Sequence, residues 1–137
     1  MLKKVSLFAS LLFLCALSTS AFAAKQTFEH FSIDVPAGWT ATQQEATVAI
    51  AANDKSASVS ITVASLQGMA IGDFAAAISS SYKGSEPEAE DDVYQFTFQL
   101  GEVESTAILT EYEEGTYALI VITGEHPQVE EIINSME

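Results

Sequence analysis

The sequence predicts an α+β fold in which one central antiparallel sheet is flanked by helices. In several short segments apolar residues alternate with polar ones, which is the period of half-buried strands. Two other segments, residues 71–82 and 127–136, instead repeat apolar residues every three or four positions, as amphipathic helices do. The strand segments are joined by short turn sequences, so we expect neighbouring strands to pair as antiparallel hairpins.

The first 23 residues predict a secretory signal peptide. Lys3 and Lys4 form a basic start, residues 5–17 are apolar, and Ala21–Ala23 has the A-x-A pattern of a processing site. The apolar stretch is about a dozen residues long, whereas a membrane-spanning helix needs about 20. We therefore expect cleavage rather than anchoring. Lipidation is not expected, because Cys15 lies within the apolar stretch and follows Leu14 rather than a small residue.

Residues 24–137 are expected to form a single domain. This length can bury one hydrophobic core without help from disulfides or metal ions. Once the signal is removed the chain has no cysteine, which excludes a disulfide framework and a thiolate zinc site. A cysteine-free domain also suits an oxidising compartment.

The chain is strongly acidic. It carries 19 Asp and Glu against five Lys and no Arg, for a net charge of −14. This sign excludes the basic face of a nucleic-acid-binding protein, and without Arg there is no bidentate phosphate contact. Electrostatic steering favours a basic protein partner.

The first half of the domain predicts three strands. Phe31–Val35 alternates apolar and polar residues and is ended by the turn at 36–38. Ala46–Ala52 forms the second strand and ends at the turn 53–55, and Ala57–Val63 is the third and clearest.

A helix is predicted next. Its stripe consists of Ile71, Phe74, Ile78 and Tyr82. Asp73 lies in the first turn, where a negative charge suits the helix dipole, and Gly84 can end the helix. Lys83–Asp92 is then expected to be a polar, acidic connection.

The second half predicts three more strands and a last helix. Tyr94–Leu100 and Val103–Tyr112 would form a hairpin around Gly101–Glu102. Tyr117–Ile122 is apolar on both faces, which predicts a central strand covered from both sides. The last helix begins near Pro127, and its apolar stripe is Val129, Ile132, Ile133 and Met136. The predicted order is three strands, a helix, three strands and a helix, giving a sheet of about six strands.

One motif carries a resemblance. Phe31-Ser32-Ile33-Asp34-Val35-Pro36-Ala37-Gly38-Trp39, directly after a signal sequence, resembles the opening of the PsbP-like superfamily, which includes the bacterial DcrB-like proteins and the Ran-binding protein Mog. The resemblance implies an antiparallel sheet flanked by helices, an α/β/α sandwich over residues 24–137. It also implies an accessory or binding protein without enzymatic activity. The partner-binding surface of the plant relative is basic, so its partners do not transfer to this acidic chain.

Two acidic sets are candidates for binding. Glu86, Glu88, Glu90, Asp91 and Asp92 could attract a hard cation such as calcium, but they lack the spacing of a calcium-binding loop, and a solvated loop is the preferred interpretation. The second set lies around the hairpin that follows, where we expect it to form one charged rim. It comprises Glu102, Glu104, Glu111, Glu113 and Glu114.

No catalytic, cofactor-binding or metal-binding residues are predicted. His30 and His126 are too few for a histidine metal centre, and Ser79–Ser81 lies on a predicted helix without a nucleophile-elbow motif. No glycine-rich phosphate loop occurs in the sequence.

These observations favour a small non-catalytic binding or accessory protein that acts through protein–protein contacts. We expect it to be periplasmic or secreted by a bacterium, and to meet the membrane only during export. The alternative is a carrier of a small apolar ligand, in which Trp39, Tyr94, Phe96 and Phe98 would line a pocket. An enzyme built from the carboxylates and His30 is the third hypothesis.

Overall fold

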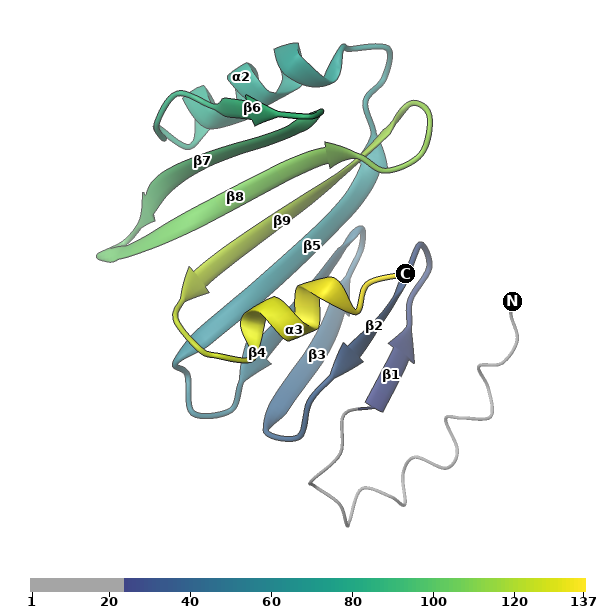
Figure 1. Ribbon diagram of the computed structural model, residues 1–137, viewed down its shortest axis with the longest axis vertical. Helices are drawn as coiled ribbons and strands as arrows, with labels where there is room; N and C mark the ends of the chain where they lie inside the picture. The colour runs from purple at the N-terminus through teal and green to yellow at the C-terminus, as the bar shows by residue number, and fades with distance from the viewer. Residues whose placement is uncertain (1–23) are drawn as a thin grey trace.

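The computed structural model describes residues 24–137, and the predicted signal peptide of residues 1–23 lies outside them. The described chain forms nine strands and two helices (Figure 1). An α+β fold built on an antiparallel sheet is therefore confirmed. Within the described residues, neither helix has the length and apolar character needed to cross a membrane.

The first part of the chain contains five strands. β1 (Ala24–Thr27) and β2 (Ser32–Val35) form a two-stranded hairpin of their own. β3 (Trp39–Gln44), β4 (Thr47–Ala52) and β5 (Ala57–Ser65) then form one side of the main sheet.

The second part contains both helices and the other four strands. α2 (Ile71–Ser81) is followed by β6 (Glu88–Glu90) and β7 (Val93–Leu100). β8 (Val103–Glu111), β9 (Thr116–Gly124) and α3 (Val129–Asn134) complete the chain. The main sheet has seven strands in the order β3-β4-β5-β9-β8-β7-β6, and every neighbouring pair is antiparallel.

β9 is the centre of the molecule. It pairs with β5 from Ala57↔Gly124 to Ser65↔Thr116, and with β8 on its other side. Along β9 the side chains alternate between two cores, since Ala118 and Ile120 face one core and Leu119 faces the other. The prediction of a strand covered on both sides is therefore confirmed.

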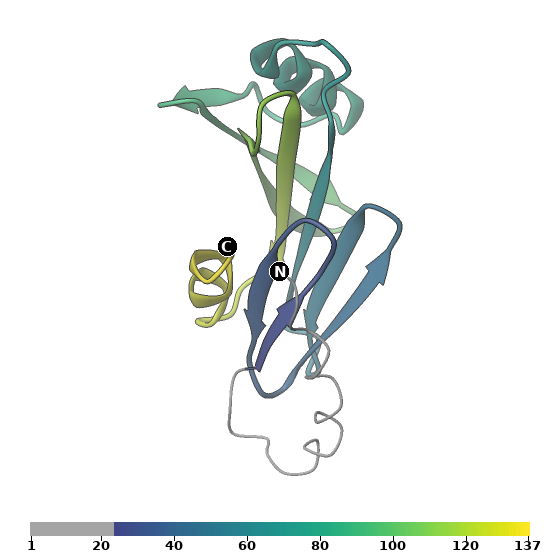
Figure 2. The ribbon, with the colours of Figure 1, turned by 90° about the vertical axis from the view of Figure 1, so that its right-hand side faces the viewer.

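The larger core lies on one face of the β3-β4-β5-β9 half. The β1–β2 hairpin and α3 cover this face, and Ile33, Ile61 and Ile132 are completely buried there. The smaller core lies on the other face, where α2 packs on β7 and β8, with Ala75 and Leu109 fully buried. The two helices thus cover opposite faces of the sheet, near opposite ends of the molecule (Figure 2).

The predicted order of elements is wrong. The structure has five strands, a helix, four strands and a helix, because β1, β3 and β6 were not predicted. The alternation of apolar and polar residues does not reveal β3, because it is an edge strand on which only Trp39 and Ala41 face the core. β6 consists of exposed residues in the segment expected to be an acidic connection, and it is held by backbone pairing to β7 alone.

The segment Phe31–Val35 is a strand as predicted, but it does not belong to the central sheet. β2 pairs with β1 and with the end of the chain, where backbone N–H and C=O groups of Ser32 and Glu137 bond each other at 3.1 and 2.9 Å. Lys25 adds ion pairs to Asp34 at 3.5 Å and to Glu137 at 3.6 Å. The β1–β2 hairpin and the C-terminal residues therefore build a second layer over the larger core.

Both helix boundaries differ slightly from the prediction. α3 begins at Val129, and Pro127 lies in the turn before it. α2 ends at Ser81, and the left-handed residue after it is Lys83, with φ of 58°. Gly84 instead permits a close approach, because a Cβ atom there would lie 2.7 Å from the carbonyl oxygen of Thr97 and 2.9 Å from the Phe96 ring.

Candidate binding groove

The first acidic set lies along the outer edge of the sheet. Glu88 and Glu90 are exposed on β6, and Asp91 and Asp92 form the turn to β7 with φ of 53° and 72°. Among residues 24–137, no three or more His, Cys, Asp or Glu side chains gather closely enough to hold a metal ion. Backbone pairing with β7 orders Glu88–Glu90 of this segment.

The second acidic set does not form one charged rim, and that expectation is wrong. Glu102 and Glu104 lie at the start of β8, whereas Glu111, Glu113 and Glu114 lie at its end. Glu104 and Glu111 lie seven residues apart along the extended strand β8, a separation of about 24 Å at roughly 3.4 Å per residue.

The two histidines lie in different places. His30 is exposed in the β1–β2 turn, 3.9 Å from the Glu29 carboxylate, and its backbone oxygen accepts a hydrogen bond from the Tyr112 hydroxyl at 2.9 Å. His126 lies between β9 and α3. The structure thus gives His30 a neighbouring carboxylate but places it in a surface turn.

The aromatic residues suggested as a pocket lining are packed in the cores. Phe96 and Phe98 are buried under α2, and the Tyr82 ring lies against Phe98 with centroids 4.7 Å apart. Trp39 is buried in the other core, and Tyr94 packs at the margin of the smaller one. These rings fill the interior, as large aromatic side chains usually do.

The serine run is also structural. Ser79 is buried on α2, and its hydroxyl donates to the carbonyl oxygen of Ala76 at 3.2 Å, within its own helix. Ser80 and Ser81 are exposed at the end of the same helix.

A corner of side chains fixes the connection between β9 and α3. The Trp39 ring meets the His126 ring edge-on, with centroids 5.0 Å apart, and Trp39 Nε1 donates to Gln128 Oε1 at 3.1 Å. The backbone N–H of Gln128 in turn donates to His126 Nδ1 at 3.0 Å. These contacts hold the start of α3 against the sheet and so define one end of a groove.

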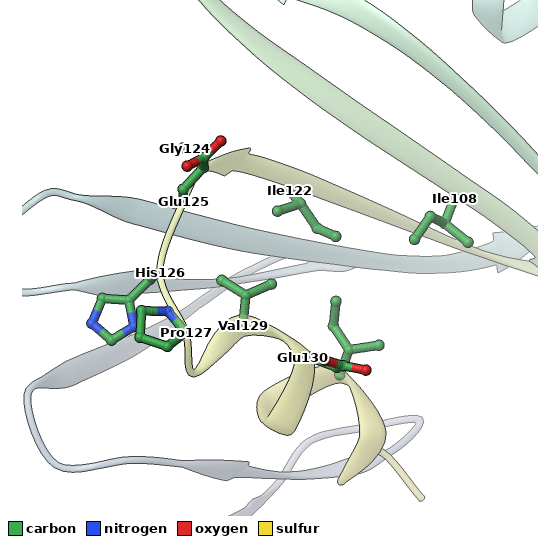
Figure 3. Close-up of a pocket in the computed structure, with 9 residues that line it drawn as sticks. Ile108, Ile122, Gly124, Glu125, His126, Pro127, Val129 and Glu130 are labelled. Carbon is green, nitrogen blue, oxygen red and sulfur yellow. The ribbon is translucent and has the colours of Figure 1, made fainter.

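The groove runs between α3 and the sheet and has a volume of about 500 Å³. Its floor and wall are apolar: Ile108 of β8 and Ile122 of β9 face Val129 of α3 (Figure 3), and Ile133 of α3 also lines it. The loop residues Gly124, Glu125, His126 and Pro127 line one end. It is the larger of the two principal hollows in the described part of the molecule.

The rim of the groove is acidic. Glu125 in the loop and Glu130 on α3 are exposed lining residues, and no Lys lines the groove. Apolar walls below two carboxylates suit a ligand that carries apolar groups next to positive charge. By contrast, the second hollow, about 380 Å³ between the end of α2 and the sheet, is lined without charged residues.

No sequence pattern marked the four apolar groove residues as functional. Ile108 and Ile122 lie in predicted strands, and Val129 and Ile133 belong to the apolar stripe of a predicted helix. They are half-buried at the margin of the larger core. No local pattern distinguishes a fully covered apolar residue from one left beside a groove.

Among residues 24–137, the pKa values of Asp54, Tyr112 and Tyr117 are shifted, and none of these three residues lines the groove. Hydrogen bonds from the side chain and backbone of Ser56 lower the pKa of Asp54 in the β4–β5 turn. Burial raises the pKa of Tyr112 and of Tyr117, and the neighbouring Glu113 and Tyr82 respectively raise each further.

Comparison with known proteins identifies similarity in fold alone. No protein-family model matches the chain, and no curated protein matches it. Among solved structures, a crystal structure from Bacteroides thetaiotaomicron is similar, with a TM-score of 0.50 and 16% sequence identity. The alignment covers 87% of this chain and 48% of that one, so this chain spans about half the length of the protein it matches.

Proposed function

We propose that this protein is a small, exported, non-catalytic binding or accessory protein that holds a protein partner in the groove beside α3. The observation that supports this most is the combination of a groove of about 500 Å³, an apolar floor and an acidic rim without Lys. A partner segment with apolar and basic side chains complements that surface.

The side chains of the groove support binding better than catalysis. His126 is the one histidine in the lining, and its Nδ1 already accepts the backbone N–H of Gln128 while its ring packs on Trp39. A general base needs a free nitrogen directed at a substrate. Here the imidazole acts as part of the corner that positions α3.

Export and the PsbP-like resemblance belong to the same proposal. The basic start, apolar stretch and A-x-A pattern of residues 1–23 support delivery to the periplasm or the exterior of a bacterium. The motif from Phe31 to Trp39 supports a relationship to accessory proteins of the PsbP-like kind, and its aromatic residues lie in the larger core.

The alternative, a carrier of a small apolar ligand, is favoured by the size of the same groove. Ligand pockets commonly have volumes of about 300–1,000 Å³, and this groove lies within that range. Such pockets bury most of their ligand, however, whereas this groove is open on one side (Figure 3). A protein segment needs no enclosure and fits an open groove better.

Site-directed crosslinking tests the proposal. Residues 24–137 contain no cysteine, so a single cysteine can carry a photoreactive label at Glu130→Cys, with Glu131→Cys as the control one residue away on the same helix. Glu130 lines the groove, and Glu131 is exposed outside its lining.

We expect a protein crosslink in the envelope fraction from position 130 that is absent from position 131 and weakens as salt is raised. Equal crosslinking at both positions would contradict the groove as the binding site. A crosslink to a small molecule instead of a protein would favour the alternative of an apolar-ligand carrier.

A further inference from the structure

We infer that the segment bound in this groove is an amphipathic α-helix with Lys or Arg on its polar side. This inference rests on the proposed function and names the shape and chemistry of the partner.

The first argument is an uncovered strip of sheet next to α3. α2 packs on β7 and β8 from one face, but no helix in the described structure lies on the other face of these two strands (Figure 1). On that face the register places Gln95 opposite Ile108 and Thr97 opposite Thr106. Gln95 is exposed, and the other three are half-buried, with Ile108 among the residues that line the groove.

The strip has the width of one helix. From β9 to β7 the sheet extends two strand spacings, or about 10 Å. A helix with its side chains is about 10–12 Å across. One helix therefore fits beside α3 and opposite α2, completing the layer on this face.

The second argument concerns backbone hydrogen bonds. The groove lies on the face of the sheet, where β7, β8 and β9 pair with one another and use their backbone groups. An extended segment placed there would find no strand edge to pair with, and its buried N–H and C=O groups would lose hydrogen bonds. A helix satisfies these groups internally, so the position favours a helix over a strand.

The third argument is the shape and charge of the lining. Val129 and Ile133 lie one turn apart on α3 and form a ridge above Ile108 and Ile122. Such a ridge accommodates the side chains of a facing helix at spacings of three and four residues. Glu125 and Glu130 at the rim then select cationic residues on the flank of that helix.

The experiment uses three synthetic 18-residue peptides as probes. The first has Leu at every third or fourth position and Lys between, the second has the same composition in an order without a helical stripe, and the third replaces Lys with Glu. Affinity is measured by fluorescence anisotropy for protein produced from its full coding sequence, at low and high NaCl. Circular dichroism confirms that each variant is folded.

Two matched pairs of variants locate the contact. Ile108→Thr removes an apolar floor residue between Thr106 and Thr110 on β8, and Val103→Thr is its control at an exposed position of the same strand outside the groove. Glu130→Gln removes a rim charge, and Glu131→Gln is its control on the same helix.

We expect the amphipathic Lys peptide to bind at least about fivefold more tightly than the other two, and Ile108→Thr and Glu130→Gln to weaken it at least about fivefold relative to their controls. Equal binding of the reordered peptide, or equal effects of variant and control, would overturn the helix inference. Absence of binding by all three peptides would also overturn the helix inference. In that case, a crosslink formed at position 130 and not at position 131 would still support the proposed function.

Discussion

Gly124 joins the end of β9 to the loop of the groove at a position where only glycine fits. Its φ is 81°, and a Cβ atom would collide with the carbonyl oxygen of Ser56, the residue just before β5. Gly68, with φ of 84°, shares the left-handed backbone but would place its Cβ in open space. Alanine substitutions at Gly124 and Gly68 therefore separate the energetic cost of backbone strain from that of a steric collision.

Gly124→Ala is expected to lower the free energy of unfolding by about 2–4 kcal/mol, because strain and collision combine. Gly68→Ala should cost only about 1 kcal/mol, through strain alone. Urea unfolding midpoints measure both. If both variants lose the same free energy of unfolding, β5 moves away from the new Cβ atom at position 124 without an energetic cost.

Asp54 makes the β4–β5 turn sensitive to acid. Its Oδ1 accepts the backbone N–H of Ser56 at 2.9 Å, and hydrogen bonds from Ser56 lower its pKa. A carboxyl with a lowered folded pKa adds stability above its unfolded pKa, and that stability is lost as the pH falls through the folded pKa. The turn should therefore loosen only in acid.

We expect the amide resonance of Ser56 to titrate with a midpoint below about 3.9, the ordinary Asp value. Asp54→Asn should abolish this titration. A midpoint at or above the ordinary value would show that the hydrogen bond does not hold the turn in solution.

At the scale of elements, the β1–β2 hairpin is held to the rest of the molecule by the end of the chain. Two backbone hydrogen bonds join Ser32 and Glu137, and the Ser135 hydroxyl accepts the N–H of Asp34 at 2.8 Å. The Lys25 ion pairs lie on the surface, with nearly half of the Lys25 side chain exposed. Surface ion pairs contribute little, so the backbone bonds should dominate.

Removal of residues 136–137 is expected to cost about 1–3 kcal/mol, from two lost hydrogen bonds and the Met136 contact with the larger core. Lys25→Ala should cost less than about 1 kcal/mol. Hydrogen exchange of the β2 amides measures the local effect. If Lys25→Ala lowers the free energy of unfolding more than the truncation does, the ion pairs rather than the backbone bonds hold the hairpin.

At the scale of the whole molecule, the net charge of −14 opposes the compact state through self-repulsion. The repulsion is concentrated where carboxylates are close in sequence, as along β6 and its turn. Salt screens such charges, since the Debye length falls from about 10 Å at 0.1 M to about 3 Å at 1 M.

Raising NaCl from 0.1 M to 1 M is therefore expected to raise the melting temperature. The double variant Glu88→Gln, Glu90→Gln should be more stable than wild type at low salt and should gain less from added salt. Calorimetry at both salt concentrations measures this. If salt raises the melting temperature of wild type and of the double variant equally, the charge repulsion does not come from Glu88 and Glu90.

Local sequence patterns are sufficient to predict the antiparallel α+β character, the central position of Tyr117–Ile122 and both amphipathic helices. These follow from the period of apolar residues, which is a local property of the chain. Edge strands such as β3 and β6 carry little of that period, because their stability comes from backbone pairing to a neighbour.

The pairing of β2 and the position of the groove depend instead on tertiary contacts. The groove combines β8, β9 and α3, and it exists because α3 packs on β2 and β5 and leaves Ile108 of β8 and Ile122 of β9 beside it. Whether Ile108 or Ile133 ends up covered depends on contacts between residues far apart in the chain. Apolar spacing shows that a residue faces inward, but the packing of distant elements determines what covers it.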